Sequence, residues 1–206
     1  MDTKCRIKHV FLLLLVQFTY SQGFTQSVSF VNHTELGLLM GRADDQDRRV
    51  NFSIQSFNGV RPHPNHEVGF LVGWDNYPDF GLMPLALGWR GILNNNQKTS
   101  LYGSLDIGHG SAWATKKVSL NNTESWYEGG LLISPAIGVR KRSRGGKNTF
   151  SWSLGFKKQK ASYARGSRAP AGTAPSSDAD LPPGFINVWN ENYVMNSLYI
   201  KWGMVF

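Results

Sequence analysis

The sequence predicts an all-β protein, an eight-stranded antiparallel β-barrel with meander topology, and three observations lead to this prediction. Eight segments alternate apolar residues with small or polar ones, which is the period of a β-strand. Downstream of the N-terminus, no window keeps the three-to-four spacing of an amphipathic helix. Finally, 22 of the 206 residues are glycine, and an interior glycine costs a helix about 1 kcal/mol relative to alanine.

The N-terminus of the sequence predicts a secretory signal peptide. The basic residues Lys4, Arg6 and Lys8 precede an apolar run at residues 10–16, which is too short to cross a bilayer as a helix. The single cysteine, Cys5, lies before that run and leaves with the signal, so no disulfide is expected. The expected division of the chain is a signal peptide at 1–22, a short periplasmic segment at 23–32 and the barrel at 33–206.

The eight predicted strands follow one another along the rest of the chain. The last one is the clearest, because every second residue up to the C-terminus is bulky and apolar, whereas the residues between are mostly small, polar or charged. Its apolar face consists of Leu198, Ile200, Trp202, Met204 and Phe206. The eight alternating segments are residues 35–41, 50–55, 68–75, 83–90, 101–108, 131–140, 150–157 and 197–206.

The second face of each predicted strand indicates which side of the sheet meets water. In a soluble sandwich the apolar face would lie inside and the other face would be covered with lysine and glutamate. Here the other face carries mainly glycine, serine and a few charges. The inverse arrangement, apolar outside and polar inside, is typical of a transmembrane barrel, and closure satisfies every backbone hydrogen bond in lipid. The sequence therefore predicts an outer-membrane barrel.

The connections between the predicted strands suggest an orientation. Two are long, residues 111–128 and 161–191, and they alternate with two short ones, residues 94–98 and 141–147. Long outer loops that alternate with short periplasmic turns are typical of outer-membrane barrels, so both termini are expected in the periplasm. Because residues 169–183 are rich in proline, alanine and serine, the loop at 161–191 is expected to be mobile and exposed.

Several of these segments resemble a known family. The chain resembles the small eight-stranded outer-membrane β-barrel proteins of Gram-negative bacteria, particularly the outer membrane protein beta-barrel domain group common in Bacteroidetes. The resemblance covers about residues 30–206 and implies location and architecture rather than an activity. It also implies that the C-terminal strand is the signal for the outer-membrane assembly machinery. The segments that carry it are GLMPLALGWRGIL, TSLYGSLDIGHG, GGLLISPAIGVRKR, NTFSWSLGFKKQ and NSLYIKWGMVF.

The inward faces of the predicted strands carry charges of both signs. An eight-stranded barrel is barely wide enough for its own side chains, and an isolated buried ion costs several kcal/mol. These charges are therefore expected to pair with one another and close the interior. The alternative is a narrow path for water, ions or small solutes. The inward charges are Glu35, Asp75, Arg90, Asp106, Arg140, Lys157 and Lys201.

Candidate catalytic and metal-binding residues are few. His109 stands at the outer end of the fifth strand with Ser111 nearby in sequence and Glu128 farther along, so a lipid A-modifying hydrolase or acyltransferase is an alternative function. The spacing of His63 and His66 matches no strong ligand pattern, so neither a metal site nor a cofactor is expected.

The charge of the chain bears on its partners. Its formal net charge is +8, but a secreted chain without a nucleic-acid-binding fold is not expected to meet nucleic acid. The expected partners are outer-membrane lipid, the phosphates of lipopolysaccharide and the assembly machinery, with no specific ligand identified. The leading hypothesis is a non-enzymatic envelope-structural or surface-contact protein. The basic residues near the outer loops are Lys116, Lys117, Lys158, Lys160, Arg165 and Arg168.

Overall fold

The computed structural model describes most of the chain, and every regular element in that part is a β-strand. A search of the described residues finds no helical segment that could span a membrane. The predicted signal peptide lies outside the described residues, as do residues 23–28 of the segment that follows it. The described residues are 29–42, 48–78, 80–112, 117–120, 122–143, 148–168, 181 and 184–206.

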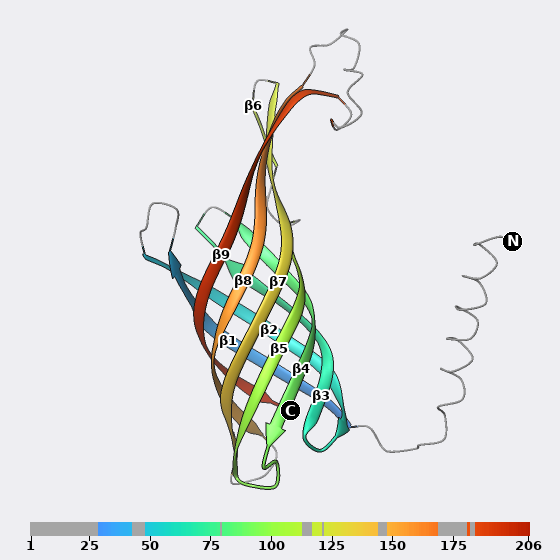
Figure 1. The fold of residues 1–206 in the computed structure, drawn as a ribbon, viewed down its shortest axis with the longest axis vertical. Coiled ribbons are helices and arrows are strands. Elements are labelled where there is room, and N and C mark those ends of the chain that lie inside the picture. The colour runs from blue at the N-terminus through green and yellow to red at the C-terminus, as the bar shows by residue number, and fades with distance from the viewer. Residues whose placement is uncertain are drawn as a thin grey trace, which may run out of the picture.

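The described residues form nine antiparallel strands in one sheet (Figure 1). Each pairs with its neighbour in chain order, except that β5 pairs with β7 and the short β6 pairs with β7 alone. The pairing of β1 with β9 joins the first and last strands of the described part of the chain. The strands are β1 (Ser29–Arg42), β2 (Arg48–His63), β3 (His66–Asn76), β4 (Gly81–Leu93), β5 (Thr99–Ser111), β6 (Val118–Leu120), β7 (Thr123–Arg142), β8 (Thr149–Arg168) and β9 (Phe185–Val205).

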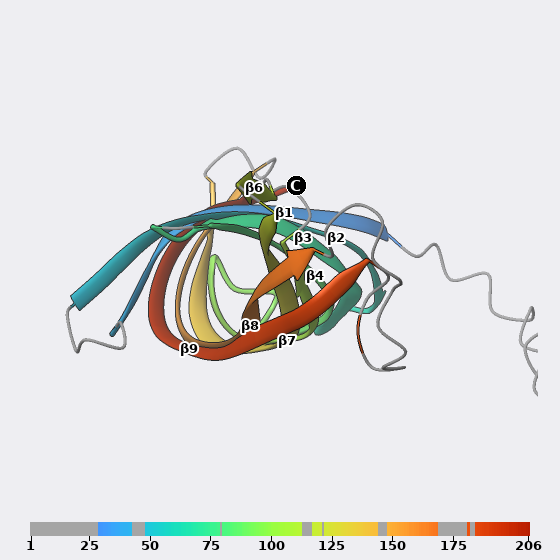
Figure 2. The same ribbon diagram turned by 90° about the horizontal axis from the view of Figure 1, so that it is seen from above.

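Eight of the nine strands close into a ring, with β6 attached outside it (Figure 2). The prediction of an all-β antiparallel sheet with sequential neighbours is confirmed. The additional strand, β6, lies in a stretch that the sequence suggested was a long connection. The first strand begins at Ser29, four residues before the predicted start at residue 33, because Val31 continues the inward face and Phe30 the outward one.

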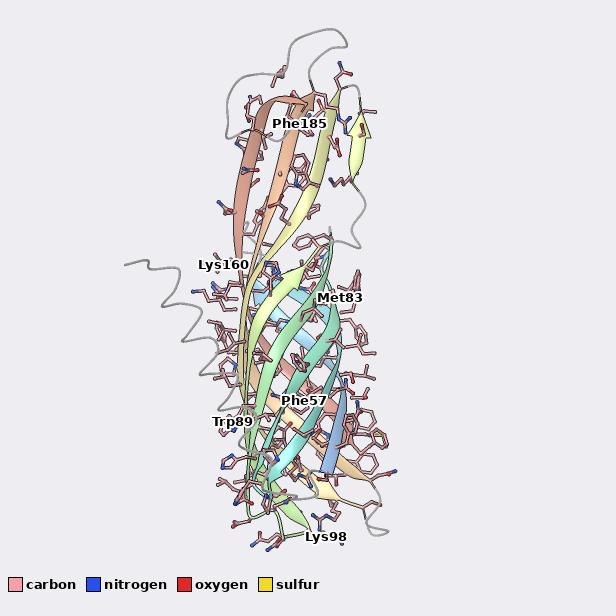
Figure 3. All side chains as sticks on the ribbon, turned by 90° about the vertical axis from the view of Figure 1, so that its right-hand side faces the viewer. Phe57, Met83, Trp89, Lys98, Lys160 and Phe185 are labelled. Carbon is pink, nitrogen blue, oxygen red and sulfur yellow. The ribbon has the colours of Figure 1, made fainter. Side chains whose placement is uncertain are left out.

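Three strands are much longer than the ring needs. β7, β8 and β9 have 20, 20 and 21 residues, but β5 pairs with β7 only from Gly130 onward and β1 pairs with β9 only from Ser197 onward. The remainder of these strands projects from one end of the ring as an extension of the same sheet, which we call the arm (Figures 1 and 3). In Figure 3, Phe185 marks the far end of the arm and Lys98 the opposite end of the molecule. The arm consists of residues 118–120, 123–129, 161–168 and 185–196.

The arm corrects the prediction of a loop at residues 161–191. Residues 161–168 belong to β8 and residues 185–191 belong to β9, while most of the proline-rich stretch between them lies outside the described residues. Residues 123–128, also predicted as a connection, belong to β7. The prediction was wrong because it required one apolar face, and both faces of the arm carry polar and aromatic residues. Backbone pairing with the next strand does not depend on such a face.

The outward face of the ring is apolar and exposed. Phe70, Leu154 and Trp202 are 71%, 56% and 43% exposed, and similarly exposed leucine, isoleucine and valine side chains occur on every strand of the ring. These three residues were assigned to the outside by period two alone. Their exposure shows that the large apolar side chains of the wall do not form a dry central core.

The inward face contains both polar and apolar side chains. The largest apolar cluster lies toward the arm and includes Leu39, Tyr77, Leu82 and Tyr199. A second cluster is built around Phe57. The interior is therefore less uniformly polar than the sequence suggested, because several inward positions, such as those of Leu39 and Phe57, were not assigned from the pattern.

Inward glycines make room for inward aromatic rings. A Cβ added to Gly88 would lie 2.9 Å from the ring of Phe57, and one added to Gly138 would lie 2.6 Å from the ring of Tyr102. Gly155 stands in the same relation to Tyr199. The abundance of glycine on this face is explained by the narrow interior, since an aromatic ring fits only where the opposing position has no side chain.

We expect the Gly155→Ala variant to be less stable than the wild type by about 1–3 kcal/mol, the usual range for overpacking a filled interior. The added methyl group would clash with the buried ring of Tyr199. The measurement is the urea midpoint of unfolding of the purified protein. Gly103→Ala is the matched control, because the nearest atom to its new Cβ would be the Ala136 carbonyl oxygen at 3.9 Å. Equal midpoints for the two variants would contradict the packing explanation.

Candidate functional site

The interior of the ring contains a network of charged side chains. All seven charged residues that the sequence assigned to the inward face are at most 5% exposed. They come from β1, β3, β4, β5, β7, β8 and β9, so the network draws on nearly the whole circumference. These residues are Glu35, Asp75, Arg90, Asp106, Arg140, Lys157 and Lys201.

Glu67 is the centre of the part of the network nearest the chain ends. Its carboxylate accepts hydrogen bonds from Arg140 at 2.8 and 3.0 Å and from Arg61 at 2.6 Å. His33 Nε2 lies 2.9 Å from Glu67 Oε2, the oxygen that also accepts the 2.8 Å bond from Arg140. Because Glu67 is on β3 and Arg140 is on β7, this group of contacts spans the interior.

Glu67 and His33 were missed by the sequence analysis, although a signal for both was present. Glu67 directly precedes Val68, which begins the outward face of its strand, so the alternation places Glu67 inside. His33 stands two residues before Glu35 and shares its face. The prediction ended each strand where the bulky apolar residues ended, and both residues lie just beyond that limit.

A second group lies around Glu35. Gln55 Nε2 donates to Glu35 Oε2 at 2.5 Å, and Lys201 Nζ donates to Gln55 Oε1 at 2.6 Å. Gln55 therefore relays between the carboxylate and the ammonium. Lys201 Nζ also lies 4.0 Å from the ring centre of Tyr199, and the Arg140 guanidinium lies 4.6 Å from that of Tyr102, so these buried cations contact aromatic faces.

Two further ion pairs complete the network. Arg90 donates to Asp106 at 2.6 Å, and its guanidinium lies 4.5 Å from the ring centre of Phe57. Lys157 pairs with Asp75, which also accepts a hydrogen bond from the Ser53 hydroxyl at 2.7 Å. The Lys157–Asp75 pair joins β8 to β3 across the interior.

The buried charges of the ring are balanced. Among the described residues of the ring, four carboxylates and four Lys or Arg cations are buried. Burial of paired, hydrogen-bonded charges avoids the cost of isolated ions, and contacts between opposite walls fill the width of the ring at their levels. The chemical effect of these buried ion pairs is to hold strands on different sides of the ring together. The carboxylates are Glu35, Glu67, Asp75 and Asp106, and the cations are Arg90, Arg140, Lys157 and Lys201.

His109 lies on the outward face of the ring. It is exposed and stands between Leu85 and Leu131 in the register of the sheet. In the described part of the chain, no hydrogen bond or ion pair joins it to Ser111 or Glu128, and the Glu128 carboxylate accepts from the Trp126 indole at 2.8 Å. The described geometry therefore provides no hydrogen-bonded nucleophile, base and acid at this position.

The other histidine candidates lie at the turn between β2 and β3. The rings of His63 and His66 are 5.5 Å apart, and His66 stacks on Trp89 at 5.9 Å. Among the residues that the structure describes, no group of three or more histidine, cysteine, aspartate or glutamate side chains is placed to hold a metal ion.

The C-terminal strand presents its predicted apolar face outward. Its last residue, Phe206, exchanges two backbone hydrogen bonds with Asn32 at 2.9 and 3.2 Å, which extends the β1–β9 pairing to the end of the chain. The side chains of this face are exposed except for Met204, which is half-buried. The face consists of Leu198, Ile200, Trp202, Met204 and Phe206.

The basic residues near the outer loops fall into distinct environments. Lys158 and Lys160 are exposed where the arm leaves the ring. Lys117 and Arg168 both approach Glu124 in the arm, within 3.9 Å for Lys117. Arg165 lies in a groove of the arm. The sixth predicted residue, Lys116, lies outside the described part of the chain.

No protein-family model matches the sequence, and no curated protein is significantly similar to it.

Proposed function

We propose that the chain is an integral outer-membrane protein whose ring is a transmembrane β-barrel with a closed interior. One observation carries the proposal: the wall of the ring exposes large apolar side chains, while the buried interior holds ion pairs. In water, contiguous apolar surface of this extent is rare on a soluble protein. In hydrocarbon it is the favourable arrangement, and because the eight strands pair in a closed circle, the ring has no free edge strand.

The orientation follows from the two unlike ends of the ring. The described turns between β2 and β3 and between β4 and β5 are short and lie at the end where the C-terminal strand finishes, whereas the arm projects from the other end (Figure 1). Short turns are typical of the periplasmic side and long extensions of the outer side. We therefore infer that both termini face the periplasm and that the arm faces outward.

The role that these features support is a structural or surface-contact role outside the membrane, without catalysis. The arm supplies the contact surface, and the network inside the ring closes the interior. Lys158 and Lys160, at the base of the arm, are placed for contact with lipopolysaccharide phosphates. The outward C-terminal face ending in Phe206 is the segment we propose for recognition by the assembly machinery.

We expect the protein to be recovered in the membrane fraction and to migrate differently on SDS gels before and after boiling. The reason is that a closed sheet in which every strand is paired resists SDS until it is heated. The measurement is fractionation of expressing bacteria followed by paired unheated and boiled gel lanes. An unshifted band in the soluble fraction would overturn the membrane placement, and steady conductance in a planar bilayer would overturn the closed interior.

A further inference from the structure

A continuous row of aromatic rings leads from the mouth of the ring onto the arm. Tyr77 packs against Phe80 with ring centres 5.4 Å apart, and Phe80 stacks on Tyr127 at 4.5 Å with nearly parallel planes. Tyr127 contacts Tyr163 at 5.0 Å, and Tyr163 contacts Trp189 at 6.5 Å. The row begins at a buried tyrosine and ends at a tryptophan that is 56% exposed. It therefore presents an aromatic surface to whatever approaches the arm.

The same face of the arm carries polar groups in register with these rings. Directly opposed residues on neighbouring strands point to one face of a sheet. On this face, Arg165 lies between Ser125 and Trp189. Two residues along β8 toward the tip of the arm, Ser167 lies between Thr123 and Asn187. Two residues along β8 toward the ring, Tyr163 lies between Tyr127 and Glu191.

Six of the residues on this face line a groove of about 470 Å³. Its lining residues supply two aromatic rings, three hydroxyl groups, an amide and a guanidinium, so the groove combines apolar ring faces with hydrogen-bonding groups. The lining residues are Thr123, Tyr163, Arg165, Ser167, Asn187 and Trp189.

Arg165 distinguishes this face from the opposite one. On the opposite face, Arg168 and Lys117 both approach the Glu124 carboxylate. Arg165 is exposed and makes no ion pair with any residue in the described part of the chain. An arginine without a carboxylate partner, beside two aromatic rings, is suited to a planar anionic group on a ligand.

We propose that this groove binds a carbohydrate chain that carries carboxylate groups. A sugar ring has an apolar C–H face that packs on Trp189 and a rim of hydroxyl groups that Ser167, Asn187 and Thr123 can bind. The plane of Tyr163 is inclined at 75° to that of Trp189, so Tyr163 contacts a neighbouring sugar of the chain. Arg165 pairs with a uronate carboxylate in a bidentate manner. A single-stranded nucleic acid also stacks on aromatic rings, but its sites follow the backbone with many cations, and this groove has one.

The inference deepens the proposed surface-contact role and rests on it for the direction in which the arm faces. The binding assay uses the full-length folded protein in detergent, so its result does not depend on membrane placement. If fractionation fails but the sugar binds, only the membrane proposal is wrong. If fractionation succeeds and the sugar does not bind, only this inference is wrong.

The test is isothermal titration calorimetry with two hexasaccharides of equal length, a hyaluronan hexasaccharide that contains uronates and a neutral cellohexaose. The detergent carries no sugar headgroup, because a maltoside would compete for the groove. We expect the uronate hexasaccharide to bind more tightly than the neutral one. The Trp189→Ala variant should bind it about tenfold or more weakly, the size of effect expected for an aromatic residue at the centre of a contact.

Two variants make the outcome specific to this groove. Trp126→Ala removes a tryptophan from the opposite face of the same arm, where it packs on Phe185, and should leave the affinity unchanged. Arg165→Gln should bring the affinity for the uronate hexasaccharide down to that for cellohexaose. Each variant is first checked for the β-sheet circular dichroism spectrum of the wild type, so that only folded protein is compared.

Three results would overturn the inference. They are no binding of either hexasaccharide by folded wild-type protein, equal losses from Trp126→Ala and Trp189→Ala, and a preference for uronate that survives Arg165→Gln. Tighter binding of a single-stranded oligonucleotide than of the uronate hexasaccharide would likewise overturn the assignment to carbohydrate.

Discussion

Replacing Asp75 with alanine is expected to lower the free energy of unfolding by about 3–5 kcal/mol, the range measured when one partner of a buried ion pair is removed. Asp75 and Lys157 are both at most 2% exposed, so the variant would leave the Lys157 ammonium buried without a counter-charge. The Ser53 hydroxyl would also lose its acceptor. The measurement is the urea midpoint in micelles, with the heat-dependent gel shift as the readout of folded protein.

A second substitution separates the effect of charge from that of lost packing. The double variant Asp75→Ala, Lys157→Met removes both charges and keeps an unbranched apolar chain, so it should regain most of the lost stability. Lys158→Met is the matched control, because Lys158 is the exposed neighbour of Lys157 on the outward face, and its effect should stay within about 0.5 kcal/mol. A double variant as unstable as Asp75→Ala alone would show that the ion pair does not account for the loss.

On the proposed membrane placement of the ring, replacing Leu154 with arginine is expected to destabilise the protein in lipid vesicles by about 2–4 kcal/mol, the cost of a cation on the lipid face near the middle of a membrane. Leu154 is 56% exposed on the outward face of β8. It stands between Ile137 of β7 and Ile200 of β9, which are also exposed, so no polar group beside it in the register can accept the new charge.

The effect of Leu154→Arg on stability is expected to differ between a membrane protein and a soluble one. On a water-facing surface, an exposed leucine replaced by arginine changes stability by no more than about 0.5 kcal/mol. Ile186→Arg is the matched control, because Ile186 is 49% exposed in the arm, beyond the ring. Unfolding of both variants from vesicles should show a loss for Leu154→Arg only. Equal and small effects would mean that the wall of the ring does not face lipid.

The assignment of side chains to the two faces of the ring could be predicted from the sequence, because side chains in a strand alternate strictly. That rule placed Phe70 and Trp202 outside and Arg90 and Lys201 inside without any knowledge of the fold. It fails where neither face is apolar. The arm was missed for this reason, and with it the position of Trp189, since nothing in the local pattern marks residues 185–191 as a strand.

Which buried charges pair with each other in the candidate site depends on the tertiary structure. Alternation shows that Asp75 and Lys157 both point inward, but the two residues are 82 positions apart and lie on opposite walls. The two side chains meet only if they lie at the same level along the axis of the ring. That level depends on the register of each strand pair between β3 and β8 and on the β1–β9 and β5–β7 pairings that close the ring. Local sequence determines which way a side chain points in this protein, whereas closure of the sheet determines which residue it reaches.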